Sequence, residues 1–108
     1  MEVKTLGEVK MAVIVSRFDA YSSKEVETVF SDLIQSGAKK LLCDFSQTEY
    51  IASAGLRVLL STAKSLQKSG GQIALCSLKP YVLEVFETAG FTQLFRIHGS
   101  QEEALKNL

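Results

Sequence analysis

Apolar and polar residues follow two different repeats along this chain. The run from Met11 to Val15 is apolar throughout and follows a glycine and charged residues, which predicts the second strand of a short antiparallel hairpin. Between Val26 and Ile34 the apolar residues recur at intervals of three and four, which predicts an amphipathic helix ending at Gly37. Ser22 and Glu25 have the spacing of a capping box and mark the start of that helix.

The middle of the chain combines a buried strand with the clearest helical pattern. Residues 41–45 form a compact apolar run typical of a buried strand, and a polar loop follows at residues 47–49. A helix is then expected from about Gly55 to Ser69, closed by the pair Gly70 and Gly71. Its apolar face comprises Leu56, Leu59, Leu60, Ala63 and Leu66.

The last third repeats the order of strand and helix. Residues 73–76 are expected to form another buried strand, and Pro80 begins a third helix that ends at Gly90. Its expected apolar face comprises Val82, Leu83, Phe86 and Ala89. A last short strand is expected at Leu94, Phe95 and Ile97, and a terminal helix follows with a capping box at Ser100 and Glu103. Strands that alternate with helices imply crossover connections, so the sequence predicts an α/β fold with a largely parallel sheet.

Composition narrows the classes of protein that this chain can represent. Its 108 residues, 46% of them hydrophobic, suffice for one domain with its own core. Twelve basic and twelve acidic side chains cancel, so we expect no nucleic-acid partner. The apolar run is far too short to cross a bilayer, and the amino terminus lacks the pattern of a secretory signal, so we expect no membrane span and a cytoplasmic protein. Cys43 and Cys76 lie in apolar runs and are expected to be reduced core residues.

The residues that usually support enzymatic chemistry are sparse. His98 is the only histidine, and no serine or cysteine is marked as its partner. Neither a CxxC pair nor an HExxH motif occurs, and the glycine pair follows a helix instead of opening one. Asp44 is either a functional carboxylate or a strand-end aspartate that bonds to loop amides. We therefore expect no enzyme, with no catalytic residue, metal or cofactor.

One stretch, Tyr50 to Leu56, connects a polar loop to the strongest helix and places Ser53 among small residues. Two interpretations of Ser53 are open. It can cap the helix through its hydroxyl. Alternatively, it can accept a phosphate, which would face free amides and the positive end of the helix dipole while adding about two negative charges to the surface.

These residues resemble a known family. The runs Asp44 to Ser46 and Tyr50 to Leu56 are similar to the signature of STAS domains, especially the bacterial anti-sigma factor antagonists. Phe18 to Tyr21 and the stretch from Gly70 through Phe91 agree with it, so the resemblance covers nearly the whole chain. It implies a single STAS domain over residues 1–108, with a mixed, mostly parallel sheet of about four to five strands and about four helices.

In such antagonists, the serine two places before the motif glycine is phosphorylated by a partner kinase that is also the anti-sigma factor. The resemblance therefore implies phosphorylation at Ser53, binding of an anti-sigma factor serine kinase in the unphosphorylated state, and restoration by a serine phosphatase. The implied partner-binding residues are Asp19, Tyr21, Ala52, Ser53, Ala54, Gly55 and Leu56. At Ala52 the sequence departs from the commonest pattern, an acidic residue before the serine. Asp19 is equally well explained as a turn aspartate that bonds to its local backbone.

Two other functions stay open on the sequence. A STAS module can serve another pathway, as a subunit of a transport system or as a scaffold in signalling. A nucleotide-binding or small-molecule sensor could use the edge that contains Asp19 and Ser53, although no phosphate-binding loop accompanies that edge.

Overall fold

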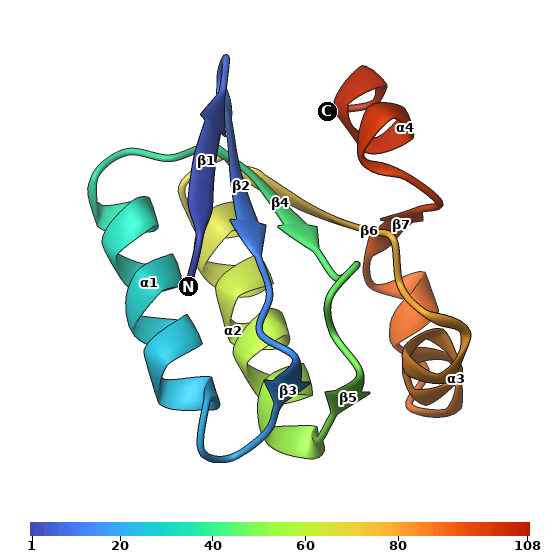
Figure 1. Cartoon of the computed structure of the whole chain (residues 1–108). Coiled ribbons are helices and arrows are strands. Elements are labelled where there is room, and N and C mark those ends of the chain that lie inside the picture. Colours follow the sequence, from blue (N-terminus) through green and yellow to red (C-terminus); the bar gives the residue numbers. More distant parts are fainter.

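A computed structural model describes the whole chain, residues 1–108, and its centre is a five-stranded sheet in the order β1-β2-β4-β6-β7 (Figure 1). These strands are β1 (Val3–Leu6), β2 (Val9–Val13), β4 (Lys40–Asp44), β6 (Gln72–Cys76) and β7 (Arg96–His98). The β1–β2 pair is antiparallel, and every other pair in this sheet is parallel. The predicted α/β class, and the hairpin as its antiparallel exception, are confirmed.

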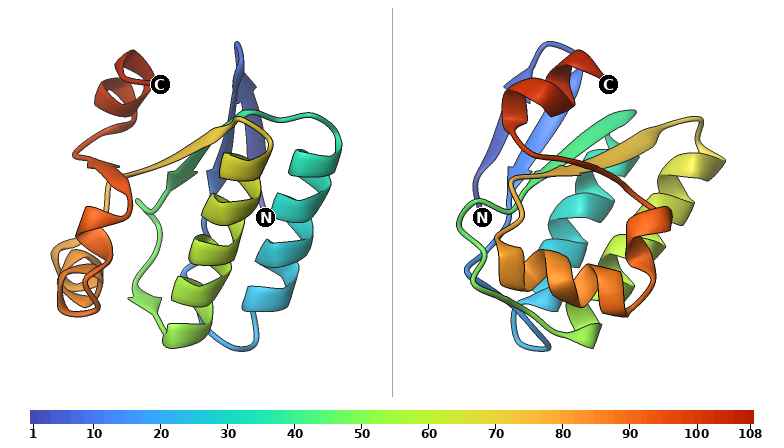
Figure 2. Two further views of the ribbon diagram at one scale, coloured as in Figure 1. Left: turned by 180° about the vertical axis from the view of Figure 1, so that it is seen from behind. Right: turned by 90° about the vertical axis from the view of Figure 1, so that its right-hand side faces the viewer.

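Helices cover both faces of the sheet. They are α1 (Ser23–Gln35), α2 (Ser53–Lys68), α3 (Pro80–Thr88) and α4 (Gln101–Lys106), with a short 3-10 turn, η1 (Phe91–Gln93). Because successive strand residues point to opposite faces, Cys43 packs in the core under α1, α2 and α3, whereas its neighbour Leu42 packs with Ala104 of α4. Figure 2 shows α4 on the other side of the sheet from α1 and α2. None of the helices is long and apolar enough to cross a membrane.

The strongest helical pattern in the sequence is α2. Leu59 and Leu66 are fully buried and Leu56 nearly so, while Leu60 and Ala63 are partly buried. The helix closes at Ser69, and Gly70 follows with a positive φ of 80°, a conformation that glycine adopts without the steric cost of a Cβ atom. The predicted apolar face and the glycine stop are confirmed.

The two predicted capping boxes differ in outcome. Ser22 occupies the N-cap position of α1, as expected, but the predicted capping box does not form: its side chain makes no capping hydrogen bond, and its Oγ donates to the carbonyl oxygen of Arg17 at 2.6 Å. Ser100 does cap α4, accepting a hydrogen bond from the amide of Glu103 at 3.1 Å. The Glu103 carboxylate does not close the box and instead lies 3.3 Å from Nδ1 of His98.

The last predicted strand is present as β7 and contains Ile97, but it does not include Leu94 and Phe95 as expected. Phe91 and Phe95 both pack against Phe86, with ring centroids 6.3 and 6.4 Å away, and the chain must turn tightly between them to do so. This turn directs Leu94 outward, where it is 57% exposed, and β7 begins only at Arg96. Ala89, expected on the apolar face of α3, is exposed and lies just after the end of that helix, at its C-cap.

The two cysteines are free and buried, as predicted. They lie on adjacent strands but on opposite faces of the sheet, Cys43 toward α1–α3 and Cys76 toward α4. Burial raises the pKa of the Cys76 thiol to about 11 and raises that of Cys43 further. Both thiols are therefore neutral core groups at physiological pH.

Candidate functional site

A second, two-stranded sheet brings the two predicted site segments together. Strand β3 (Arg17–Phe18) pairs in parallel with β5 (Tyr50–Ile51), and just beyond this pair the amide of Ala52 donates to the carbonyl oxygen of Phe18 at 3.0 Å. The loop from β3 to α1 and the turn from β5 to α2 consequently lie side by side at one end of the molecule (Figure 1). The sequence did not predict these strands, because two residues are too few to show a period.

Hydrogen bonds from residues 48–50 to the chain just after β2 fix β5 in this position. Thr48, expected in a polar loop, is fully buried, and its Oγ1 donates to the carbonyl oxygen of Val15 at 3.0 Å. The amides of Glu49 and Tyr50 both donate to the carbonyl oxygen of Ser16, at 2.8 and 3.2 Å. No feature of the sequence distinguishes Thr48 from its exposed polar neighbours, because its role depends on the distant end of β2.

Ser53 is the first helical residue of α2 and does not cap it. The capping position belongs to Ala52, whose backbone is extended, and no side chain bonds to the amides of the first turn. The Ser53 side chain is exposed and makes no hydrogen bond within the protein. The interpretation of Ser53 as a cap is wrong. Its hydroxyl is free, and the amides of Ser53 and Ala54 have no acceptor in the protein.

Gly55 and Leu56 face inward and position the first turn of α2. A Cβ atom on Gly55 would lie 2.8 Å from the carbonyl oxygen of Phe18 and 3.0 Å from Cγ1 of Ile51. Only glycine allows α2 to approach β3 and β5 this closely. Leu56 is 8% exposed and packs in the core. Ser53 is therefore exposed, and the packing of Gly55 and Leu56 fixes its position at the start of α2.

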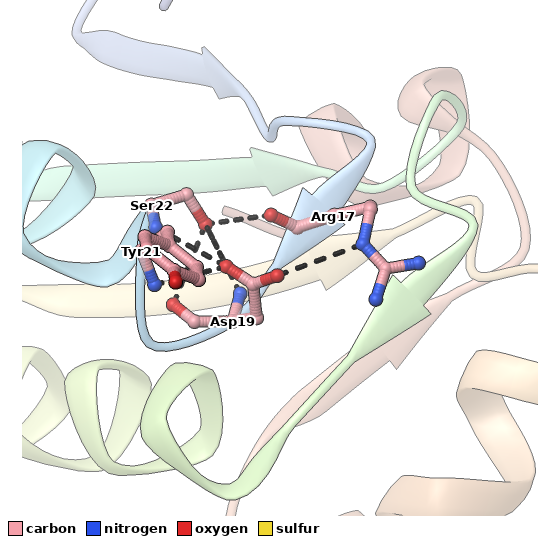
Figure 3. Close-up of polar contacts among 4 residues, drawn as sticks. All are labelled: Arg17, Asp19, Tyr21 and Ser22. Atoms are coloured by element: carbon pink, nitrogen blue, oxygen red, sulfur yellow. Dashed lines mark hydrogen bonds and ion pairs between the residues drawn. The ribbon is translucent and has the colours of Figure 1, made fainter.

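Asp19 organises the loop from β3 to α1 (Figure 3). Its Oδ1 accepts hydrogen bonds from the amides of Tyr21 at 3.0 Å and Ser22 at 3.2 Å, and its Oδ2 lies 3.6 Å from Nε of Arg17. The hydrogen bond from the Ser22 amide, with smaller contributions from the Tyr21 amide and Arg17, holds the pKa of this carboxyl below its usual value. The turn interpretation of Asp19 is confirmed. Tyr21 projects from the same loop and is 96% exposed.

A shallow groove adjoins Ser53 between α2 and α3. It has a volume of about 400 Å³, and its walls comprise Ser53, Leu56, Tyr81, Glu84, Val85, Thr88 and Ala89. Tyr81 is 55% exposed there, and Glu84 is the charged residue of the groove. Sequence reasoning missed this groove, because it exists only once α3 packs beside the start of α2.

The other two candidates lie outside this site. Asp44 accepts hydrogen bonds from the amide of Ser46 at 2.9 Å and from its hydroxyl at 3.1 Å, which confirms the strand-end interpretation. His98 lies on β7 opposite Cys76, on the sheet face that α4 covers. The Glu103 carboxylate lies within hydrogen-bonding distance of Nδ1 of the His98 ring.

Solved structures of other proteins share this fold. The crystal structure of a Thermotoga maritima protein named as an anti-sigma factor antagonist superimposes with a TM-score of 0.91, at 23% identity over 98% of this chain and 92% of its own. The Bacillus cell fate determinant SpoIIAA, solved in its phosphorylated form, gives a TM-score of 0.78 at 18% identity over 98% of this chain and 96% of its own. At these identities, the comparisons establish the fold.

Sequence relatives establish the family. The STAS domain model matches residues 1–104. The Bordetella bronchiseptica protein BtrV, named as an anti-sigma factor antagonist, is 39% identical over 83 residues, which cover 77% of this chain and 72% of BtrV. The anti-sigma-B factor antagonist of Bacillus subtilis is 27% identical over 82% of this chain and 81% of its own length. The chain therefore belongs to the STAS domain family and, within it, to the bacterial anti-sigma factor antagonists.

Proposed function

We propose that this chain is an antagonist switched by phosphorylation at Ser53. In the unmodified form it binds an anti-sigma factor that is also a serine kinase, and this binding frees a sigma factor for transcription. Phosphorylation of Ser53 by the bound kinase releases the antagonist, and a serine phosphatase restores it. The chain acts in the cytoplasm and supplies the acceptor hydroxyl and the binding surface, while the kinase supplies the metal and the catalytic groups.

The observation that supports this proposal most directly is the free hydroxyl of Ser53. Serine at the start of a helix usually caps it and is thereby engaged with the backbone. Here Ala52 occupies the capping position, so the Ser53 side chain is exposed without a hydrogen-bond partner. The side chains on either side, Ala52 and Ala54, are small, which leaves room for a kinase active site to approach the hydroxyl.

The first turn of α2 can accept a phosphate without unfolding. The amides of Ser53 and Ala54 have no acceptor in the protein, and the positive end of the helix dipole points toward the added charge. The phosphorylated form of SpoIIAA, whose fold is similar to that of this chain, supports the idea that the fold is compatible with phosphate. The consequence of modification is therefore expected outside the chain, at the partner.

The surroundings of Ser53 explain why a partner would sense the phosphate. Tyr81 is exposed in the groove that Ser53 also lines, and Tyr21 is exposed in the loop from β3 to α1. Tyrosine is enriched in protein interfaces. A phosphate on Ser53 would have to be desolvated on binding, with the Glu84 carboxylate in the same groove. A penalty of about 2.8 kcal/mol would weaken binding roughly a hundredfold.

The test begins with the partner. The Ser53→Ala protein, which cannot be phosphorylated at this position, is used to capture the anti-sigma factor from the source organism, and that factor is then produced in recombinant form. Calorimetric titration is expected to show that wild type and Ser53→Ala bind it with similar affinity and that Ser53→Asp binds about a hundredfold more weakly. Incubation with ATP is expected to transfer phosphate to wild type and not to Ser53→Ala.

Ser100→Asp is the matched control, because it adds one negative charge at the start of α4 on the other face, where aspartate caps as well as serine. It should bind like wild type. Ala52→Asp restores the acidic neighbour common in the family and is expected to change the rate of phosphorylation without creating a second acceptor. Phosphate transfer to Ser53→Ala, or wild-type affinity of Ser53→Asp, would show that Ser53 is not the switch.

A further inference from the structure

The solvent-facing side of α2 has a charge pattern unlike that of the rest of the molecule. The chain as a whole has twelve basic and twelve acidic residues, yet α2 contains Arg57, Lys64 and Lys68 and no acidic residue. All three cationic side chains are exposed, and none takes part in an ion pair. Lys68 lies in the last turn, where the helix dipole favours a cation, but folding gives no such reason for Arg57 and Lys64.

The three cations form a narrow line that starts at Ser53. With about 3.6 residues per turn, Ser53, Arg57, Lys64 and Lys68 fall within about 60° around the helix axis. At about 1.5 Å per residue, the line runs for about 16 Å from Arg57 to Lys68. The exposed Ser61 and Ser65 lie beside it, and all except Ser53 border one shallow depression on the surface. We call Arg57, Lys64 and Lys68 the basic stripe.

We propose that the basic stripe docks an acidic surface of the anti-sigma factor, with carboxylates spaced along about three helical turns. This inference rests on the proposed function, because it extends the interface at Ser53 along α2. The charges around the basic stripe favour an acidic protein surface as its occupant over a continuous polyanion such as RNA or an anionic membrane. The carboxylates of Glu27 and Asp32 on α1 line the groove immediately beside α2, and Glu84 lies in the groove near Ser53. They would repel RNA or an anionic membrane but can flank a discrete acidic ridge.

The residues of the basic stripe differ in their distance from Ser53, and this distance decides whether a phosphate on Ser53 affects them. Arg57 lies four residues after Ser53, a spacing at which side chains on a helix meet, so a phosphate on Ser53 competes with the partner for Arg57. Lys64 lies about 16 Å further along the axis than Ser53, beyond the screening length of about 8 Å at physiological salt. Lys64 and Lys68 therefore contribute to binding to the same extent whether or not Ser53 is charged.

The test measures affinity for the recombinant anti-sigma factor at about 50 mM and about 500 mM NaCl. The double variant Lys64→Glu/Lys68→Glu is expected to bind about tenfold more weakly than wild type at low salt, with the difference falling below about threefold at high salt. The control Lys4→Glu/Lys106→Glu changes the net charge equally but alters exposed lysines on β1 and α4, and it should bind like wild type. Circular dichroism checks that each variant keeps its fold.

Combination with the switch variant separates the two proposals. Adding Ser53→Asp to Lys64→Glu/Lys68→Glu should multiply the two losses of affinity, whereas adding it to Arg57→Gln should give less than the product. If Ser53→Asp has no effect while the lysine variant still weakens binding, the switch is wrong and the stripe stands. If the lysine variant binds like its control, the stripe is wrong and the switch stands. Tighter binding of wild type to an oligouridylate or to phosphatidylserine vesicles than to the anti-sigma factor would also overturn the proposed occupant.

Discussion

Gly55→Ala tests the contact that fixes Ser53 on the surface. The added methyl group would lie 2.8 Å from the carbonyl oxygen of Phe18, 2.9 Å from Cγ of the same residue and 3.0 Å from Cγ1 of Ile51. Phe18 is fully buried and Ile51 nearly so, which leaves their side chains little room to move. The Phe18 carbonyl oxygen also accepts a hydrogen bond from the amide of Ala52. Displacing this carbonyl would disturb the hydrogen bond that joins the two site segments.

The balance of energies favours destabilisation. Alanine in place of glycine within a helix gains about 1 kcal/mol. Inserting a methyl group into a packed site costs about 1 to 3 kcal/mol, toward the upper end here because a backbone atom is among the neighbours. Weakening the hydrogen bond from Ala52 to Phe18 adds about 1 kcal/mol. The net loss is about 2 to 3 kcal/mol, which corresponds to a fall in Tm of roughly 10 °C for a domain of this size.

Urea and thermal unfolding measure this loss directly. Gly99→Ala is the control, because a Cβ atom there meets only Oε2 of Glu103, at 3.9 Å, and its stability should lie within about 0.5 kcal/mol of wild type. Phosphate transfer to Gly55→Ala should also slow, since the first turn of α2 is displaced from β3. A Gly55→Ala protein as stable as wild type would show that the close approach of α2 to β3 does not exist in solution.

Three shorter predictions concern the core and the site. Leu59→Ala removes a fully buried side chain from α2 and should cost about 2 to 5 kcal/mol in urea unfolding, whereas a loss below about 1 kcal/mol would contradict its burial. In an NMR titration, the Asp19 carboxyl of Arg17→Gln should still have a pKa below that of an ordinary aspartate, because the hydrogen bond from the Ser22 amide lowers it most. The stabilisation by this carboxylate is present above the pKa of an ordinary aspartate and is lost as the pH falls through the folded-state pKa. The raised pKa of Cys76 predicts no reaction of the native protein with a thiol reagent at pH 8, and rapid labelling would refute it.

The main sheet and its helices could be predicted because their signals are local. Each of these signals depends only on residues close by in the sequence. Examples are the helical repeat of α2, the proline that begins α3 and the glycines that end the helices. Where prediction failed, the deciding contact came from a distant segment. Leu94 is exposed because Phe91 and Phe95 both reach Phe86, and an apolar pattern alone cannot show that a turn intervenes.

The segments of the candidate site could be singled out from the sequence, but the way in which they come together could not. The runs around Asp19 and Ser53 could be singled out from the sequence, but their adjacency depends on β3 and β5, which are two residues long, and on the buried Thr48. The helix boundary was also misplaced. A start two residues earlier than expected makes Ser53 a helical residue instead of a cap, and this shift decides whether its hydroxyl is free.

The position of Ser53 indicates how the proposed phosphorylation would act. A modification can shift a protein between conformations only if it interacts differently with each of them. In the observed conformation, the free amides of Ser53 and Ala54 and the helix dipole already favour a phosphate on Ser53, so the modification stabilises the existing arrangement. The packing of Gly55 against Phe18 opposes any movement of the first turn. The proposed switch therefore needs no rearrangement of this chain, and its effect resides in the charge that the partner meets at a fixed position.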